Sequence, residues 1–318
     1  MNHKLVRLGI SLQEEVWNLT HYIRTGTLLK HLEQRYRWHL FQQKEAKWRQ
    51  HVSTRNPLLY TLRNGSRIAL YPDDALSRDI YFDEFERDEQ EFVQNFLRNG
   101  DIFVDVGANI GLYTLIGARS VGVAGHIFAF EPTAQTFEKL KNNVTLNHFP
   151  NVTLIPFALS DQMEERPITV SLDGYQAWNS LARPSRGQVL EQELVSCTTW
   201  EAYAEEHRLL GRVRLMKIDV EGWELRFLLG AREALADQNS PHLLIEFTEE
   251  NAHNAGTTCA EVYHQLERLG YQMYHINSGD KSLVRETLRE HYPFVNLIAT
   301  KDVSFILSRL QWKVTELP

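Results

Sequence analysis

The segment from Val104 to Gly111, VDVGANIG, constrains the fold of this chain more than any other stretch. Mostly apolar residues over 102–106 predict a buried strand, and the apolar run 112–118 predicts a helix directly after it. Gly107 and Gly111 allow a sharp turn between the two and leave backbone N–H groups exposed at the start of the helix. A strand, a glycine turn and a helix in this order predict a binding site for a nucleotide-like ligand.

Two acidic residues indicate which ligand suits this turn. Asp105 lies at the end of the strand, where its carboxylate would repel a pyrophosphate but suits a positive centre or hydroxyl and ammonium donors. Glu131 ends the next predicted strand, 126–130, where it can accept hydrogen bonds from both ribose hydroxyls. S-adenosylmethionine carries a sulfonium, an ammonium and a ribose diol, so we expect it as the cofactor. The alternative is a glycine turn in another doubly wound protein, with Glu131 solvated. The residues of this region that we expect to bind the cofactor are Asp105, Gly107, Asn109, Gly111 and Glu131.

Strands and helices alternate over the rest of the chain, which predicts a parallel sheet with helices on both faces. The predicted strands are 102–106, 126–130, 152–156, 213–219, 242–247, 271–276 and 295–300, and the predicted helices between them are 133–147, 227–236 and 259–269. Ahead of this sheet we expect a hairpin with strands 58–62 and 67–71 and a helix over 88–98.

Residues 162–212 interrupt this alternation. An insertion on the ligand side of an open sheet is well placed to cover the acceptor of a reaction. Trp178 and Asn179 are candidates to line the acceptor pocket, and the alternative is a shielding hairpin in which Trp178 is simply packed.

Several segments together resemble the FkbM family of S-adenosylmethionine-dependent methyltransferases. The similarity extends over roughly residues 58 to 300 and implies a class I methyltransferase fold. This is an α/β, Rossmann-like, doubly wound sheet of seven mostly parallel strands, whose last strand inserts antiparallel between the fifth and sixth. The family usually methylates a hydroxyl, without a fixed acceptor. The segments that carry the resemblance are Ile80–Glu86, Val104–Gly111, Phe130–Pro132, Ala158–Asp161, Met216–Gly222 and Ile245–Phe247.

Acidic residues follow several of the predicted strands, at the edge where open sheets bind ligands. Asp161 follows the third strand and could accept a proton of the adenine amino group, or it could cap a turn. Alternation along the fourth strand puts Lys217, Asp219 and Glu221 on one side, facing the cleft. We expect catalysis by a member of this trio.

Methyl transfer to an alcohol needs an in-line approach and a base for the departing proton. Asp219 or Glu221 could be that base. Lys217 could serve instead if burial lowers its pKa, or it could pair with an acid and orient it. The structural alternative is a Lys–Glu ion pair that braces the sheet edge. Asp219, Glu221 and Glu246 could also hold Mg²⁺ and polarise a diol, although their spacing matches no fixed ligand pattern.

The charge is distributed unevenly along the chain. Residues 1–55 hold ten Lys or Arg and four Asp or Glu, a charge of +6. The net charge of the whole chain is −7, so the remaining residues together carry −13. An acidic body argues against nucleic acid as the substrate. Residues 1–56 form a basic helical arm, predicted from 10 to 52 with a break near 25–27. Its part over 28–55 packs on its own domain or on a second copy, or contacts an anionic membrane or a glycan-assembly partner.

The remaining domain boundaries follow from these elements. We expect a methyltransferase domain over 57–301, in which 57–100 form the hairpin and helix, and a C-terminal appendage over 302–318. Two cysteines are too few for a disulfide framework, and no stretch approaches the ~20 apolar residues of a membrane span. No signal peptide is apparent, so we expect a cytoplasmic protein.

These observations predict O-methylation of a hydroxyl on a sugar, a glycan or a small natural product. The rival hypothesis is a non-catalytic module of the same fold that acts through its basic arm. A nicotinamide-dependent oxidoreductase is disfavoured, because the D-x-G-x-N-x-G pattern differs from a dinucleotide fingerprint.

Overall fold

The computed structural model describes residues 28–72, 74–171 and 190–315, and the chain divides into two compact units, Met1–Asn56 and Pro57–Pro318. The described part of the first unit is one helix, α2 (Leu28–Thr54). Its residues are good helix formers without proline, and ion pairs four residues apart, Glu33–Arg37 and Glu45–Arg49, support it. None of the described helices combines the length and apolar character required to cross a membrane.

The second unit begins with the predicted hairpin, β1 (Leu58–Thr61) and β2 (Arg67–Leu70), which pair antiparallel. Gly65 in its turn has a φ of +82°, which a glycine adopts at no steric cost. Two asparagines of helix α6 (Ala134–Asn147) hold the hairpin: Asn143 Oδ1 accepts from the N–H of Ala69 and Asn147 Oδ1 accepts from that of Arg67, each at 2.7 Å. Helices α3 (Ala75–Phe82) and α4 (Arg87–Phe96) then lead into the main sheet.

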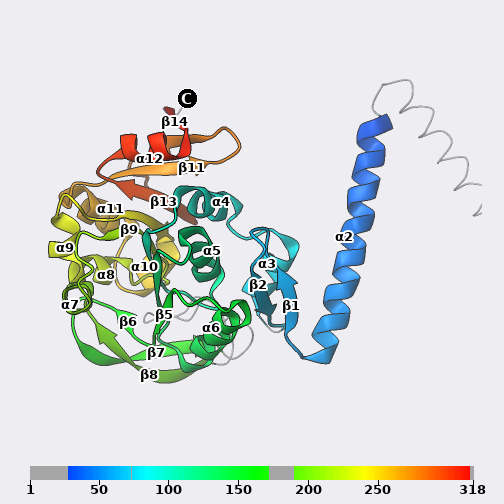
Figure 1. The fold of residues 1–318 in the computed structure, drawn as a ribbon, viewed down its shortest axis with the longest axis horizontal. Helices are drawn as coiled ribbons and strands as arrows, with labels where there is room; N and C mark the ends of the chain where they lie inside the picture. The colour runs from blue at the N-terminus through cyan, green and yellow to red at the C-terminus, as the bar shows by residue number, and fades with distance from the viewer. Residues whose placement is uncertain (1–27, 73, 172–189, 316–318) are drawn as a thin grey trace, which may run out of the picture. The chain divides into compact units, whose positions relative to one another are not determined.

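The main sheet has nine strands in the order β14-β12-β11-β13-β10-β9-β3-β4-β5 (Figure 1). The strands from β5 to β10 are parallel, and β13 runs antiparallel between β10 and β11. These seven strands reproduce the predicted class I methyltransferase sheet. The bounds are β3 (Ile102–Val106), β4 (His126–Phe130), β5 (Val152–Ile155), β9 (Val213–Ile218), β10 (His242–Phe247), β11 (Gln272–Asn277) and β13 (Val295–Thr300).

Two short strands extend the sheet beyond the predicted seven. β12 (Ser282–Arg285) forms a hairpin with β11, and β14 (Lys313–Thr315) pairs parallel with β12. The described part of the expected C-terminal appendage, 302–318, forms helix α12 (Val303–Leu310) and an edge strand of the main sheet, and the boundary itself stays a prediction. The hairpin leaves an unpaired edge, and β14 satisfies its backbone groups.

Two groups of helices flank the sheet, as in a doubly wound fold (Figure 1). The first group consists of α4, α5 (Leu112–Val121), α6 (Ala134–Asn147) and α12. The second group consists of α7 (Trp200–Glu206), α8 (Glu224–Gly230), α9 (Arg232–Ala236) and α11 (Cys259–Arg268). The short helix α10 (Glu249–Asn254) follows β10. The helix predicted over 227–236 is instead two short helices. Gly230, at the end of α8, lies so close to the Ser160 carbonyl that a Cβ there would be 1.9 Å from its oxygen.

Two strands of the predicted insertion, 162–212, form a separate small sheet with a strand that lies just before it, in the order β6-β8-β7. Its strands are β6 (Ala158–Leu159), β7 (Glu164–Ser171) and β8 (Leu190–Thr198). Ala158, Ile168, Val195 and Cys197 make its own apolar core. Trp178 and Asn179 lie outside the described residues, as does the part of the arm predicted over 10–27.

Replacing Gly107 by Ala tests the packing of the turn after β3. Gly107 has a φ of +82°, and a Cβ there would lie 1.9 Å from the carbonyl oxygen of Asp219. We expect G107A to cost at least about 3 kcal/mol, or roughly 5 °C in Tm, because the backbone must move. G100A is the matched control: Gly100 has a φ of +93° with no atom within 4 Å, so it carries only the backbone cost of about 1 kcal/mol. Equal Tm values for the two variants, measured by tryptophan fluorescence, would contradict this packing.

Candidate active site

Two adjoining cavities lie at the carboxyl ends of the central strands. The smaller has a volume of about 60 Å³ and the larger about 260 Å³. The walls of both include Gly107, Asn109, Asp219 and Glu221. The shared wall therefore holds two predicted cofactor residues, Gly107 and Asn109, beside two predicted catalytic residues, Asp219 and Glu221. Gly111 lines neither cavity.

The turn after β3 is built from left-handed residues. Gly107, Asn109 and Gly111 have φ angles of +82°, +49° and +97°. A Cβ on Gly111 would lie 2.7 Å from Leu140 Cδ1, and one on Gly107 would meet the carbonyl oxygen of Asp219. Both glycines are thus required by the protein's own packing, a reason that the sequence analysis did not foresee.

Glu131 follows β4 and lines the smaller cavity, as its predicted role requires. It is 7% exposed, and its Oε1 accepts hydrogen bonds from the N–H and the hydroxyl of Thr133, at 3.0 and 2.6 Å. Its Oε2 accepts from the N–H of Asn109 at 3.2 Å. Burial raises the pKa of Glu131 to about 7, although these hydrogen bonds favour the carboxylate. The neighbouring turn thereby fixes this carboxyl group in place.

Apolar side chains surround the rest of the smaller cavity, and the sequence analysis did not single them out. Such a wall suits a flat aromatic ring. Trp223 is anchored by a hydrogen bond from its Nε1 to Ser160 Oγ, at 3.0 Å. The apolar lining residues include Phe130, Pro132, Phe157, Leu159, Ile168 and Trp223.

Asp161 is outside the residues that line either cavity. Its Oδ2 accepts from Arg226 at 2.8 Å, and its Oδ1 accepts from Ser160 Oγ at 3.0 Å. Burial would raise the pKa of Asp161, but the hydrogen bonds from Arg226 and Ser160 outweigh it and lower that pKa. Asp161 is thus an ion-pair partner of Arg226, and both its expected contact with adenine and its expected role as a turn cap stay predictions.

Lys217 is buried in the larger cavity among carboxylates. Its Nζ donates to Asp219 Oδ2 at 2.5 Å and lies 4.6 Å from the ring centre of Tyr113. Burial alone would lower the pKa of Lys217, but the charges of Asp219, Glu86 and Asp105 outweigh it and raise that pKa. The ammonium is therefore retained, which supports Lys217 as a partner that orients Asp219 and argues against its role as a base.

Asp105 lies at the back of the same cavity, 1% exposed at the end of β3. Its Oδ2 accepts a hydrogen bond from Thr114 Oγ1 at 2.5 Å. Burial raises the pKa of Asp105, while Lys217 and Thr114 act in the opposite direction.

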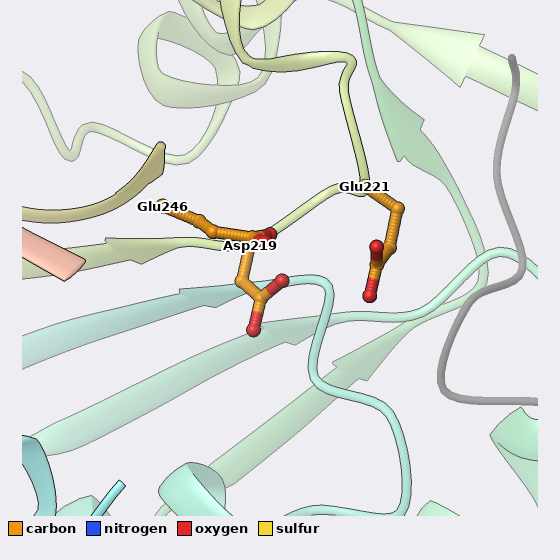
Figure 2. Close-up of side chains that lie close together, drawn as sticks. All are labelled: Asp219, Glu221 and Glu246. Carbon is orange, nitrogen blue, oxygen red and sulfur yellow. The ribbon is translucent and has the colours of Figure 1, made fainter. Parts of the chain in front are cut away.

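Three carboxylates gather at the ends of β9 and β10, as Figure 2 shows. One oxygen each from Asp219, Glu221 and Glu246 lies within 4.8 Å of the others. The strand ends at Ile218, so Glu221 reaches this cluster through a turn with a φ of +53° and not by strand alternation. Asn251 Nδ2 donates to Glu221 Oε2 at 2.6 Å.

The cluster affects the ionisation of its members. Burial is the main cause that raises the pKa of Glu221 well above its ordinary value, and the charge of Asp219 is the second cause. Burial also raises the pKa of Glu246 well above its ordinary value, followed by the charges of Glu221 and Asp219. Burial would raise the pKa of Asp219 too, but Lys217 outweighs it and lowers that pKa, so Asp219 is ionised at neutral pH.

A further carboxylate in the larger cavity, Glu86, was missed as a site residue. It accepts hydrogen bonds from the Tyr113 hydroxyl at 2.6 Å and from Asn296 Nδ2 at 2.7 Å. Burial raises the pKa of Glu86, and Lys217 lowers it. The signal available in the sequence was its place in the segment Ile80–Glu86 that carries the family resemblance.

A family model described as a methyltransferase FkbM domain matches residues 105–273. This chain belongs to the FkbM methyltransferase family. The resemblance inferred from the sequence is confirmed, and the family supports S-adenosylmethionine as the cofactor.

Individual relatives align over part of the chain. The hexuronic acid methyltransferase AglP of Haloferax volcanii is 28% identical over 161 residues, which cover 48% of this chain and 60% of that protein. The 31-O-demethyl-FK506 methyltransferase FkbM of Streptomyces tacrolimicus is 30% identical over 167 residues, 43% of this chain and 62% of that protein. The chain thus spans less than two thirds of the length of these two relatives. Among solved structures, an O-methyltransferase of Thermotoga maritima aligns with a TM-score of 0.39 at 12% identity, covering 77% of this chain and 78% of that one.

Replacing Lys217 by Met tests the buried charge network. K217M leaves Asp219, Asp105 and Glu86 without their shared cation, so we expect a loss of about 3–5 kcal/mol in the free energy of unfolding. K141M is the control, because Lys141 pairs with Glu138 on the surface, where side chains are 57% and 61% exposed. It should change stability by less than about 0.5 kcal/mol. Equal urea midpoints for the two variants would show that Lys217 does not hold this network.

Proposed function

We propose that this chain transfers a methyl group from S-adenosylmethionine to a hydroxyl of a sugar, a glycan or a small natural product. One observation carries the proposal: two cavities share a wall, one suited to an adenosyl group and the other rich in carboxylates. A methyl donor and its acceptor must meet across such a wall.

The smaller cavity has the groups that an adenosyl ligand needs. Glu131 has a buried carboxylate at the mouth of the Gly107–Gly111 turn, where it would accept from the ribose hydroxyls. The apolar wall that includes Phe157 and Ile168 would hold the adenine ring. Asp105 faces the larger cavity, where it would bind the ammonium group. When bound, S-adenosylmethionine supplies an electrophilic methyl group on a sulfonium that becomes a neutral thioether after transfer.

The larger cavity supplies groups for an acceptor hydroxyl. Asp219 is ionised because of Lys217, so in the resting protein it can accept the hydroxyl proton as oxygen attacks. Lys217 holds the Asp219 carboxylate in one orientation through its 2.5 Å contact. Glu221 lies beside Asp219 and would hydrogen-bond a neighbouring hydroxyl of the acceptor. We place Asp219 as the base and Glu221 as the positioning group.

The relatives' names suggest which acceptors to test first. One name contains a hexuronic acid and another an O-demethyl natural product. Sugars, sugar acids and polyhydroxylated natural products are therefore the first acceptors to offer.

Replacing Glu131 by Gln tests the cofactor assignment and its pH dependence. We expect E131Q to weaken S-adenosylmethionine binding roughly 10- to 100-fold, because a charged hydrogen-bonding partner is lost. The pKa of Glu131 is about 7, and the ribose hydroxyls need the ionised form. Binding to the wild type should therefore tighten as pH rises from 6 to 8, and E131Q should lose this slope.

Calorimetric titration at several pH values measures both effects. E138Q is the control, because Glu138 is 61% exposed on α6 and should leave affinity and slope unchanged. Unchanged affinity in E131Q would contradict the ribose assignment.

Methyl transfer itself is tested with labelled S-adenosylmethionine and a set of monosaccharides, uronic acids and polyhydroxylated natural products. We expect label on a hydroxyl oxygen of at least one acceptor, identified by mass spectrometry and NMR. D219N should slow this transfer at least about 100-fold while binding S-adenosylmethionine within a few-fold of the wild type. Transfer by D219N at the wild-type rate would remove Asp219 as the base.

A further inference from the structure

The cluster of Asp219, Glu221 and Glu246 has a feature that methyl transfer alone does not explain. Three carboxylates from the end of β9 and from β10 converge in the larger cavity, with oxygens within 4.8 Å (Figure 2). Carboxylates at this spacing repel each other unless a proton or a cation lies between them.

Glu246 has a buried oxygen without a donor. The residue is 5% exposed, and its Oε1 accepts from Thr248 Oγ1 at 2.5 Å. No N–H or O–H group of the described residues donates to its Oε2. The neighbouring polar group is the Asp219 carboxylate, with which Glu246 makes a hydrogen bond only when Glu246 carries a proton. A buried place between two carboxyl groups that must hold either a proton or a cation is a position where a cation can bind.

Lys217 does not meet this need. Its ammonium donates to Oδ2 of Asp219 and not to Oε2 of Glu246. The same ammonium is also shared with Glu86 and Asp105. One buried cation therefore faces more carboxylates than it can neutralise.

We propose that Asp219, Glu221 and Glu246 bind a divalent cation that prefers oxygen ligands, such as Mg²⁺ or Mn²⁺. Carboxylate oxygens without histidine or cysteine suit these ions better than Zn²⁺. Three carboxylates leave coordination positions of an octahedral ion open toward the cavity. Two adjacent hydroxyls of an acceptor can take these positions, so the site selects a vicinal diol. The metal site stands on the carboxylates alone; its role toward the acceptor rests on the proposed function.

Titration of the full chain with MnCl₂, followed by the electron paramagnetic resonance signal of free Mn²⁺, tests the site. We expect one bound Mn²⁺ per chain in the wild type, with competition by Mg²⁺. E246Q should weaken Mn²⁺ binding at least about 10-fold, because it removes one anionic ligand. The matched control is E250Q, which removes an exposed carboxylate of the same cavity outside the cluster and should leave Mn²⁺ affinity within 2-fold.

Absence of Mn²⁺ binding by the wild type at millimolar concentrations, or equal affinity in E246Q and the wild type, would overturn the proposal. Circular dichroism monitors folding of E246Q, and E221Q gives an independent test of the same ligand set.

S-adenosylmethionine with a ¹³C-labelled methyl group separates this proposal from the proposed function. Bound Mn²⁺ should broaden the methyl resonance in the wild type and not in E246Q, because the cluster lies on the wall shared by the two cavities. Cofactor binding without Mn²⁺ binding refutes the metal site and leaves the proposed function intact. Mn²⁺ binding without cofactor binding refutes the proposed function and leaves the metal site intact.

Discussion

Close packing between two turns at the carboxyl ends of β3 and β9 organises this protein. The N–H of Asp219 donates to the carbonyl of Val106 at 3.1 Å, and the carbonyl of Asp219 occupies the space where a Cβ of Gly107 would lie. The turn from Gly107 to Gly111 and the turn that carries Asp219 and Glu221 therefore have one fixed arrangement. Because of it, the two cavities share a wall, and backbone packing sets the position of that wall.

The charge in the larger cavity is unusual for a protein interior. Burying a carboxylate costs folding free energy unless it is paired with a cation or a hydrogen-bond donor. Here the charge of Lys217 interacts with Asp219, Glu86 and Asp105 together. A region rich in carboxylates beside the smaller cavity favours positively charged ligands and disfavours a pyrophosphate. Such fixed charges cost no reorganisation at the moment of reaction, which is how a site of this type assists transfer of a cationic group.

The sequence predicted the seven-stranded sheet because each strand is a short apolar run between turn signals. The sequence also predicted where Glu131 lies, because a carboxylate directly after a parallel strand must lie at the ligand-binding edge of the sheet. β12 and β14 were missed because their pairing depends on an edge that exists only in the folded sheet. Asp161, like Glu131, follows a strand. Its carboxylate pairs with Arg226, which is distant in sequence, and it lines neither cavity.

Glu86 and Trp223 were missed for a related reason. Each comes from a turn, and each reaches its cavity through hydrogen bonds to distant residues: Tyr113 and Asn296 for Glu86, and Ser160 for Trp223. Periodicity predicts which face of a strand or helix is buried, but it contains no information on such long-range contacts.

A crystal structure of the full chain with S-adenosylhomocysteine tests the central claim most directly, because the claim concerns where a ligand lies. The account predicts the ribose hydroxyls against Glu131, the adenine ring between Phe157 and Ile168, and the sulfur directed toward Asp219. A ligand bound elsewhere, or with its ribose away from Glu131, would contradict it.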